Sequence, residues 1–197
     1  KEGQNIVPYT IDYLKSGKDG YQWIMYVCTN MNDITNYLNW KYDNLPSEYE
    51  MIIYDITNNR LINMNSDEYV FDNKYKNHPV QFKVLAGTKE YLNQELTELK
   101  KEIPQEFLLY QNYPNPFNPS TTLRYDIAKR SNVNIVIYNI LGQKVKTLIA
   151  NNIHEPGRYS ILWNGLNDND IRVTSGVYIY RIEANGFLKN KKMMILK

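Results

Sequence analysis

The sequence predicts an all-β chain of two immunoglobulin-like β-sandwich domains in tandem, joined by a short helix or linker. The first observation is composition, because 18 of the 197 residues are tyrosines, and aromatic residues favour pleated, half-buried strands. The second is patterning, since short apolar runs alternate with Gly, Asn and Pro turn signals at the spacing of a sandwich. The third is charge: residues 1–105 hold 11 basic and 15 acidic side chains, a net −4, whereas residues 106–197 hold 12 and 6, a net +6.

The first domain is expected over residues 1–87, as a β-sandwich. Its clearest strands are the aromatic and β-branched runs at 21–28, 49–56 and 80–86, with a further candidate at 37–42. Asn58-Asn59 suits a hairpin turn, because Asn accepts a positive φ at low cost. About six or seven short strands in this length favour an immunoglobulin-like sandwich. Cys28 is interpreted as a buried strand residue.

Residues 88–106 are expected to be a helical or extended linker. Leu92, Leu96 and Leu99 recur at intervals of four and three, which is helical spacing. Pro104 then ends any helix near Ile103.

The second domain is expected over residues 107–197. Its strand candidates are Thr121–Ile127, 133–140, 144–149, 159–163, Gly176–Ala184 and 187–196, and each gap contains a Gly, Asn or Pro signal. Val133, Ile135 and Ile137 share one face of their strand and are predicted to be core residues. Gly142 is placed in a turn that needs a positive φ.

Composition excludes several chemistries. The chain has two histidines and one cysteine, so it cannot build a Cys-His zinc cluster or an internal disulfide. His78 and His154 are expected in exposed turns. The carboxylates Asp12, Asp19, Glu48, Glu50 and Asp55 are scattered among turns without a nucleophile elbow or phosphate loop, so we expect no enzyme activity and no cofactor.

The most distinctive segment is QNYPNPFNPSTTLRY, residues 111–125. Pro114, Pro116 and Pro119 fix their own φ and restrict the residues before them. These restrictions predict a stiff, polyproline-like lead-in. We expect it to pack Tyr113 and Phe117 on the end of the sandwich.

Six segments from about residue 107 to Lys197 together resemble the type A C-terminal sorting domain of the bacterial type IX secretion system. They are QNYPNPFNPSTTLRY, IYNILGQKVKTL, PGRY, WNG, SGVYIYRIEANG and KKMMILK. The resemblance implies a seven-stranded immunoglobulin-like sandwich that carries a protein from the periplasm across the outer membrane. In that family the domain is often cleaved afterwards, and the cargo is attached to surface lipopolysaccharide or released.

The resemblance also implies which residues form the sorting-signal motifs. The proline motif, the Gly-x-Tyr motif and the basic, apolar last strand fall on Pro114, Pro116, Pro119, Gly176, Tyr178, Lys191, Lys192, Met193, Ile195, Leu196 and Lys197. The chain departs from many relatives by having Asp170 where they have Gly. Asp168 and Asp170 are therefore a weak calcium candidate. We favour a simple turn, because no bidentate Glu follows at a calcium-loop spacing.

The last strand is expected to be an edge strand with exposed backbone groups and a basic entrance. We hypothesise that an outer-membrane translocation component binds it. Residues 1–100 resemble, more weakly, the spacer sandwich that precedes such domains in large secreted proteins. A cargo domain is therefore expected to precede Lys1.

Two other interpretations stay open. The first is carbohydrate binding by Trp23, Trp40 and Trp163, although core placement of these side chains is favoured. The second is a self-assembling surface fibre, through edge strands and a flexible segment at residues 1–10. Nucleic-acid binding is not expected, because the positive charges of the second domain are spread without a recognition helix.

Overall fold

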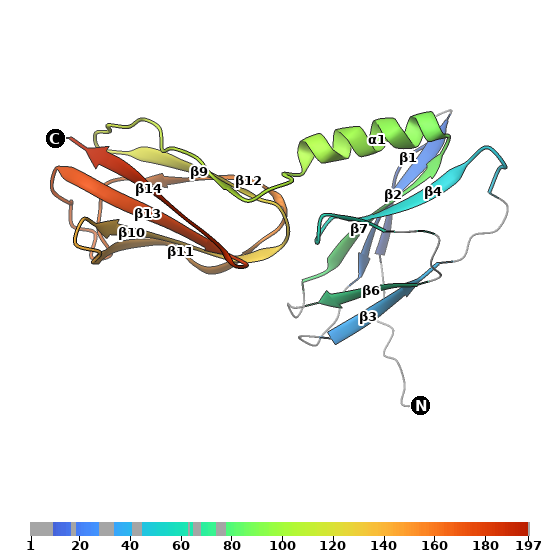
Figure 1. Ribbon diagram of the computed structural model, residues 1–197, viewed down its shortest axis with the longest axis horizontal. Coiled ribbons are helices and arrows are strands. Elements are labelled where there is room, and N and C mark those ends of the chain that lie inside the picture. The colour runs from blue at the N-terminus through green and yellow to red at the C-terminus, as the bar shows by residue number, and fades with distance from the viewer. Residues whose placement is uncertain are drawn as a thin grey trace. The chain divides into compact units, whose positions relative to one another are not determined.

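The computed structural model describes residues 10–16, 19–27, 34–40, 45–62, 64, 68–73 and 78–196. Cys28, Lys197 and residues 1–9 lie outside the described residues. The chain divides into two compact units, Lys1–Lys101 and Glu102–Lys197 (Figure 1). Apart from one helix, the regular elements of the described residues are all strands, paired antiparallel, which confirms the predicted all-β class. That helix is not long and apolar enough to cross a membrane.

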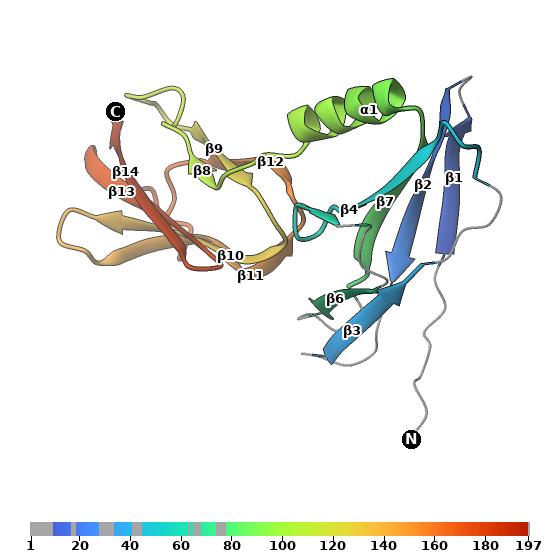
Figure 2. The same ribbon diagram turned by 45° about the vertical axis from the view of Figure 1, so that its right-hand side comes forward.

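The first unit contains a five-stranded sheet and a two-stranded sheet (Figure 2). The larger sheet has the order β1 (Thr10–Ser16), β2 (Gly20–Val27), β7 (Val80–Gly87), β4 (Glu50–Asp55), β5 (Arg60–Ile62). The smaller pairs β3 (Ile34–Asn39) with β6 (Glu68–Asn73). The turn between β4 and β5 contains Asn59 at a φ of 54°, which agrees with the predicted hairpin.

Side chains of β7 point alternately to the two faces of the larger sheet, and both faces are covered. Val80 and Phe82 point into the core shared with the smaller sheet, where the Phe82 ring meets the Phe71 ring edge-on at 5.1 Å. Lys83 points to the opposite face and pairs with Glu95 of helix α1 (Lys89–Glu102), at 3.4 Å. The helix therefore covers the face of the sheet opposite to β3 and β6.

Two glycines allow α1 to approach this sheet closely. A Cβ on Gly20 or Gly87 would lie 2.3 or 2.6 Å from the Tyr91 ring, which is far inside van der Waals contact. Leu92 and Leu99 are buried, as the helical spacing of the leucines predicts.

The second unit is a sandwich of seven strands in two sheets. One has the order β11 (Lys144–His154), β10 (Ser131–Asn139), β13 (Gly176–Ala184), β14 (Phe187–Ile195), and the other β12 (Gly157–Trp163), β9 (Thr121–Ile127), β8 (Leu108–Leu109). β9 and β13 have the predicted bounds. Val133, Ile135 and Ile137 are fully buried, so the predicted core face of β10 is confirmed.

The expectation that His154 is exposed is wrong. His154 is 9% exposed at the end of β11, and its Nε2 lies 3.0 Å from the Tyr125 hydroxyl. The Tyr159 ring meets the imidazole edge-on at 4.5 Å. The other ring nitrogen, Nδ1, lies 3.2 Å from the Asn152 carbonyl oxygen. Both nitrogens therefore have partners, as buried polar atoms require, and the histidine closes one end of the core.

Candidate functional site: the last strand and the proline strap

Strand β14 has one buried and one exposed face. It pairs with β13 in a register that places Met193 beside Tyr178 and Ile195 beside Gly176. Met193 and Ile195 are 1% exposed and belong to the core, whereas Met194 and Leu196 point outward. The predicted apolar motif residues Met193 and Ile195 therefore hold the sandwich together and are not free to contact a partner.

The outer edge of the end of β14 is covered by residues 111–119, which we name the proline strap. The Phe117 N–H donates to the Met194 carbonyl at 3.0 Å, and the Leu196 N–H donates to the Phe117 carbonyl at 2.9 Å. Two side chains extend this cover. Asn115 Oδ1 accepts the Met194 N–H at 2.9 Å, and Gln111 Nε2 donates to the Lys192 carbonyl at 2.7 Å.

From Lys192 to Leu196, this cover corrects the expectation that the edge of the last strand has exposed backbone groups. The strap acts as a short parallel partner, with a bridge between Phe117 and Ile195. Its two side-chain contacts then complete the cover from Lys192 to Leu196. Covering an edge in this way blocks uncontrolled pairing with other chains.

The strap itself is bent and not polyproline-like. It contains bends over most of residues 114–119 and two isolated β-bridges, at Tyr113 and Phe117. The peptide bonds preceding Pro114, Pro116 and Pro119 are cis. Phe117 packs into the core as predicted, at 2% exposure, but Tyr113 is 76% exposed, so its predicted packing is wrong.

Two residues outside the predicted motifs anchor the strap. Asn112 is 2% exposed, and its Nδ2 donates to the Pro114 carbonyl at 3.0 Å and to Thr121 Oγ1 at 2.9 Å. Tyr180, from β13, accepts the Asn112 N–H at 2.9 Å and donates its hydroxyl proton to the Tyr110 carbonyl at 2.7 Å. Burial raises the pKa of Tyr180 to about 12. The sequence signal is an Asn two residues before the first proline of the strap, since Asn often bonds to nearby backbone groups.

Motifs that are distant in sequence meet around Trp163. Its ring lies 5.6 Å from Phe117 of the strap and 5.6 Å from Tyr178 of the Gly-x-Tyr motif. The Tyr178 hydroxyl donates to the Thr174 carbonyl at 3.0 Å. Gly176 has a φ of 151°, which favours glycine. Gly176 and Tyr178 thus shape the start of β13.

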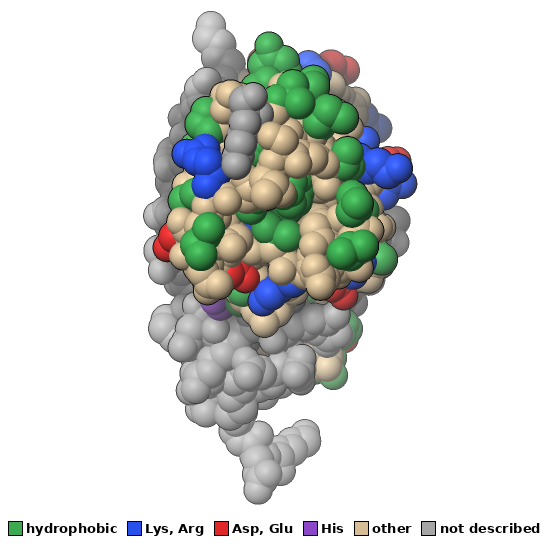
Figure 3. Space-filling view, turned by 90° about the vertical axis from the view of Figure 1, so that its left-hand side faces the viewer, with side chains coloured by type: hydrophobic (Ala, Val, Ile, Leu, Met, Phe, Trp, Pro, Cys, Tyr) green, Lys and Arg blue, Asp and Glu red, His purple; other side chains and the backbone are tan. Residues whose placement is uncertain are grey.

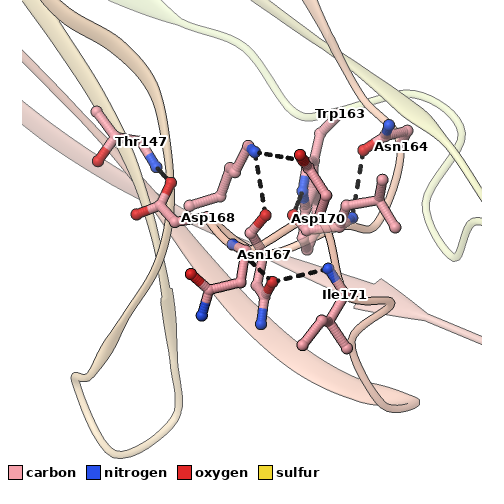
Figure 4. A network of polar contacts seen from close by, with 10 residues as sticks. Thr147, Trp163, Asn164, Asn167, Asp168, Asp170 and Ile171 are labelled. Atoms are coloured by element: carbon pink, nitrogen blue, oxygen red, sulfur yellow. Dashed lines mark hydrogen bonds and ion pairs between the residues drawn. The ribbon is translucent and has the colours of Figure 1, made fainter.

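The loop after Trp163 is organised by Asn167 (Figure 4). Asn167 Oδ1 accepts the N–H groups of Asn169 at 3.0 Å and Ile171 at 2.9 Å. Asp170 has a φ of 58°, in the left-handed region that Gly occupies most easily and that Asp and Asn tolerate. This geometry agrees with the preferred turn interpretation and explains how Asp replaces Gly here.

The carboxylates of this loop are engaged by β11. Asp168 accepts the Thr147 N–H at 2.9 Å and lies 3.5 Å from Lys144, whereas Asp170 lies 3.2 Å from Lys146. The hydrogen bond from Thr147, and then Lys144, hold the pKa of Asp168 below its usual value. Within the described ranges, no group of three or more His, Cys, Asp or Glu side chains is placed to hold a metal ion.

Among the other candidate residues, Trp163 and Asp55 are found in structural roles. Trp163 is 1% exposed, and Trp23 and Trp40 are half-buried. Asp55 is fully buried and accepts the Tyr69 hydroxyl at 3.0 Å, so it stabilises the first unit. Asp19, Glu48 and Glu50 are exposed, and the side chain of Asp12 is not described.

Comparison with known proteins gives the second unit a family. Residues 111–196 match the family model of the secretion system C-terminal sorting domain. These residues are a C-terminal sorting domain. The match begins at the strap and ends after β14, so the sorting domain contains both parts of the candidate site. No curated protein matches the chain.

Two solved structures are similar to the chain at 15% sequence identity. One is PorZ, an essential bacterial surface component of the type-IX secretion system of Porphyromonas gingivalis, with a TM-score of 0.32 over 65% of this chain. The other is dimeric latent PorU from the same organism, with a TM-score of 0.40 over 98% of this chain. The match spans only 15% and 20%, respectively, of those chains.

One end of the sorting domain exposes apolar side chains (Figure 3). Ile140 and Leu141, in the turn between β10 and β11, are 71% and 76% exposed, and Leu196 is 49% exposed. The chain leaves β14 at this end, beside the strap. This surface is not visible in the sequence, because single apolar residues in turns give no periodic signal.

Proposed function

We propose that the sorting domain directs a covalently linked preceding cargo through outer-membrane type IX translocation components, and that the chain has no catalytic activity of its own. A sorting domain of this family directs export to the cell surface or secretion. The observation that carries the proposal is the meeting of the strap, the Trp163 segment, the Gly176 segment and β14 in one structure. A signal made of four segments can be bound only when the domain is folded.

The first unit fits a spacer between cargo and signal. Its buried carboxylate Asp55 stabilises the fold through its contact with Tyr69. Cleavage after export, and attachment of the cargo to surface lipopolysaccharide, belong to the same proposal.

Reporter export in a bacterium with a type IX system tests this function. A fluorescent protein with a periplasmic export signal would be fused ahead of residues 1–197, and a matched fusion would lack residues 102–197. We expect the full fusion at the cell surface or in the medium and the truncated one in the periplasm. A fusion lacking Lys191–Lys197 tests the last strand, and its normal surface delivery would contradict a signal that includes that strand.

An adhesive role is the second candidate, because aromatic side chains gather on the first unit. The Tyr21 and Trp23 rings are stacked at 6.1 Å, and Tyr49 lies 6.4 Å from Tyr21, which is 40% exposed. Aromatic faces of this kind bind sugar rings. Polysaccharide pull-down that is lost in Trp23→Ala and retained in Trp163→Phe would support this role.

A further inference from the structure

The first half of β14 offers backbone groups that the strap does not reach. β14 is an edge strand, and in an antiparallel pair alternate residues direct their backbone groups to the same side. Met194 and Leu196 direct theirs away from β13, toward the strap. Leu188 and Asn190 are in phase with them, so their N–H and C=O groups also point outward. Within the described part of the chain no other strand is hydrogen-bonded to this edge, although β8 lies close to β14. Leu188 remains 54% exposed.

This open stretch is strongly basic. Lys189 and Lys191 lie within it and Lys192 at its end, and residues 184–197 contain no acidic residue. In the part of the chain that the structure describes, none of these three lysines forms an ion pair, whereas Lys144 and Lys146 of β11 are both paired. The charges are therefore available to a partner. Successive lysines project to both faces of any added strand.

The opposite edge of the same sheet is less suited to pairing. β11 contains irregularities in its register with β10, and such bulges blunt an edge. The loop that contains Asp168 covers part of it, because the Asp168 N–H donates to the Val145 carbonyl at 2.9 Å and its carboxylate accepts from Thr147. Over the described ranges, the beginning of β14 has neither a register irregularity with β13 nor a covering loop of this kind.

We infer that the outward edge of β14 at Leu188 and Asn190, next to the strap, binds an extended, acidic segment of the translocation machinery by strand addition. The inference rests on the proposed sorting function and names how the signal is bound. Backbone hydrogen bonds to Leu188 and Asn190 would give affinity, and carboxylates at alternating positions would meet the lysines. The strap occupies the Lys192 carbonyl through Gln111, so it ends the pairing there and fixes its register. A second copy of β14 is a poorer occupant, since lysines would oppose lysines.

The variant Asn190→Pro distinguishes a role of β14 in partner binding from its role in folding. Asn190→Pro removes an N–H that points away from β13, which an edge strand tolerates, but it blocks an added strand. Both Asn190→Pro and Asn190→Ala lose the side-chain hydrogen bond from Arg181 Nε to Asn190 Oδ1, which is 3.2 Å long. Only Asn190→Ala keeps the backbone N–H. The difference between the two variants therefore measures the backbone contribution. In the reporter fusion we expect Asn190→Pro to lower surface delivery about tenfold relative to Asn190→Ala, equivalent to about 1.4 kcal/mol.

Thermal unfolding of the purified chain checks that the two variants are equally folded. If Asn190→Pro is unfolded, a variant with Lys189, Lys191 and Lys192 all replaced by Glu decides, and its normal export overturns the inference. Equal export of folded Asn190→Pro and Asn190→Ala also overturns it. A concentration-dependent dimer of the chain that Asn190→Pro abolishes would identify a second copy as the occupant and reject the acidic segment. Periplasmic retention of the unmutated fusion would instead reject the proposed function.

Discussion

The Tyr180 hydroxyl accepts the backbone N–H of Asn112 at 2.9 Å, across 68 residues of sequence. The same hydroxyl donates to the Tyr110 carbonyl, so one side chain from the core satisfies two backbone groups where the strap leaves β8. Unpaired backbone groups in a buried site cost free energy. The position of the strap on β14 therefore depends on a residue of β13.

Replacement of Tyr180 by Phe should loosen the strap. The ring volume stays, but the buried Asn112 N–H loses its acceptor, which costs about 1–3 kcal/mol of unfolding free energy. Urea unfolding should show this loss, and amide hydrogen exchange should speed up over residues 110–117. Unchanged exchange there would show that Tyr180 does not anchor the strap.

Alkaline pH should destabilise the sorting domain. Burial raises the pKa of Tyr180 and of Tyr125 to about 12, whereas a tyrosine in the unfolded chain titrates at about 10. The folded state therefore keeps protons that the unfolded state loses, so stability is full below about pH 10 and falls as pH rises toward 12. Urea midpoints measured from pH 8 upward should decline above pH 10. Tyr180→Phe should decline less steeply, and Tyr113→Phe, at an exposed position, should follow the unmutated chain.

The two aromatic residues of the strap should differ sharply in their contribution to stability. Phe117→Ala leaves a cavity beside Trp163 and should cost about 3–5 kcal/mol. Tyr113→Ala removes a side chain that is 76% exposed and should change stability by less than about 0.5 kcal/mol. Equal losses in chemical unfolding of the two variants would contradict the placement of Phe117 in the core.

Calcium should leave the sorting domain unchanged. Lys144, Lys146 and the Thr147 N–H already engage Asp168 and Asp170, so an ion would have to displace these contacts. The melting temperature should be the same with millimolar calcium and with a chelator. A rise with calcium that Asp168→Asn abolishes would show that the loop binds the ion.

The strands with strong patterns could be predicted from the sequence. β9 and β13 are bounded by turn signals and contain aromatic or β-branched residues, and the alternation around Ile135 identifies the core face. β1 and β8 were missed. Thr10–Ser16 mixes polar and charged residues with few apolar ones, and Leu108–Leu109 is too short for a periodic signal.

The candidate site could be predicted only in part. The proline motif and the last strand are visible as local sequence. Their pairing is not, because it depends on hydrogen bonds such as that from Gln111 to Lys192, 81 residues apart. His154 was misplaced for a related reason: its polar surroundings in sequence conceal the Tyr125 and Tyr159 rings that enclose it in space.

The bond between Gln111 and Lys192 also bears on how the domain reaches its native state. The strap begins the domain, and the strand that it covers ends it, so closure joins the two extremes of this segment. Contacts of such long sequence separation form late and slow the search for the native fold. A chain interrupted before Met194 cannot form the strap contacts to Met194 and Leu196. Closure of the strap therefore reports that the whole segment has been made and has folded.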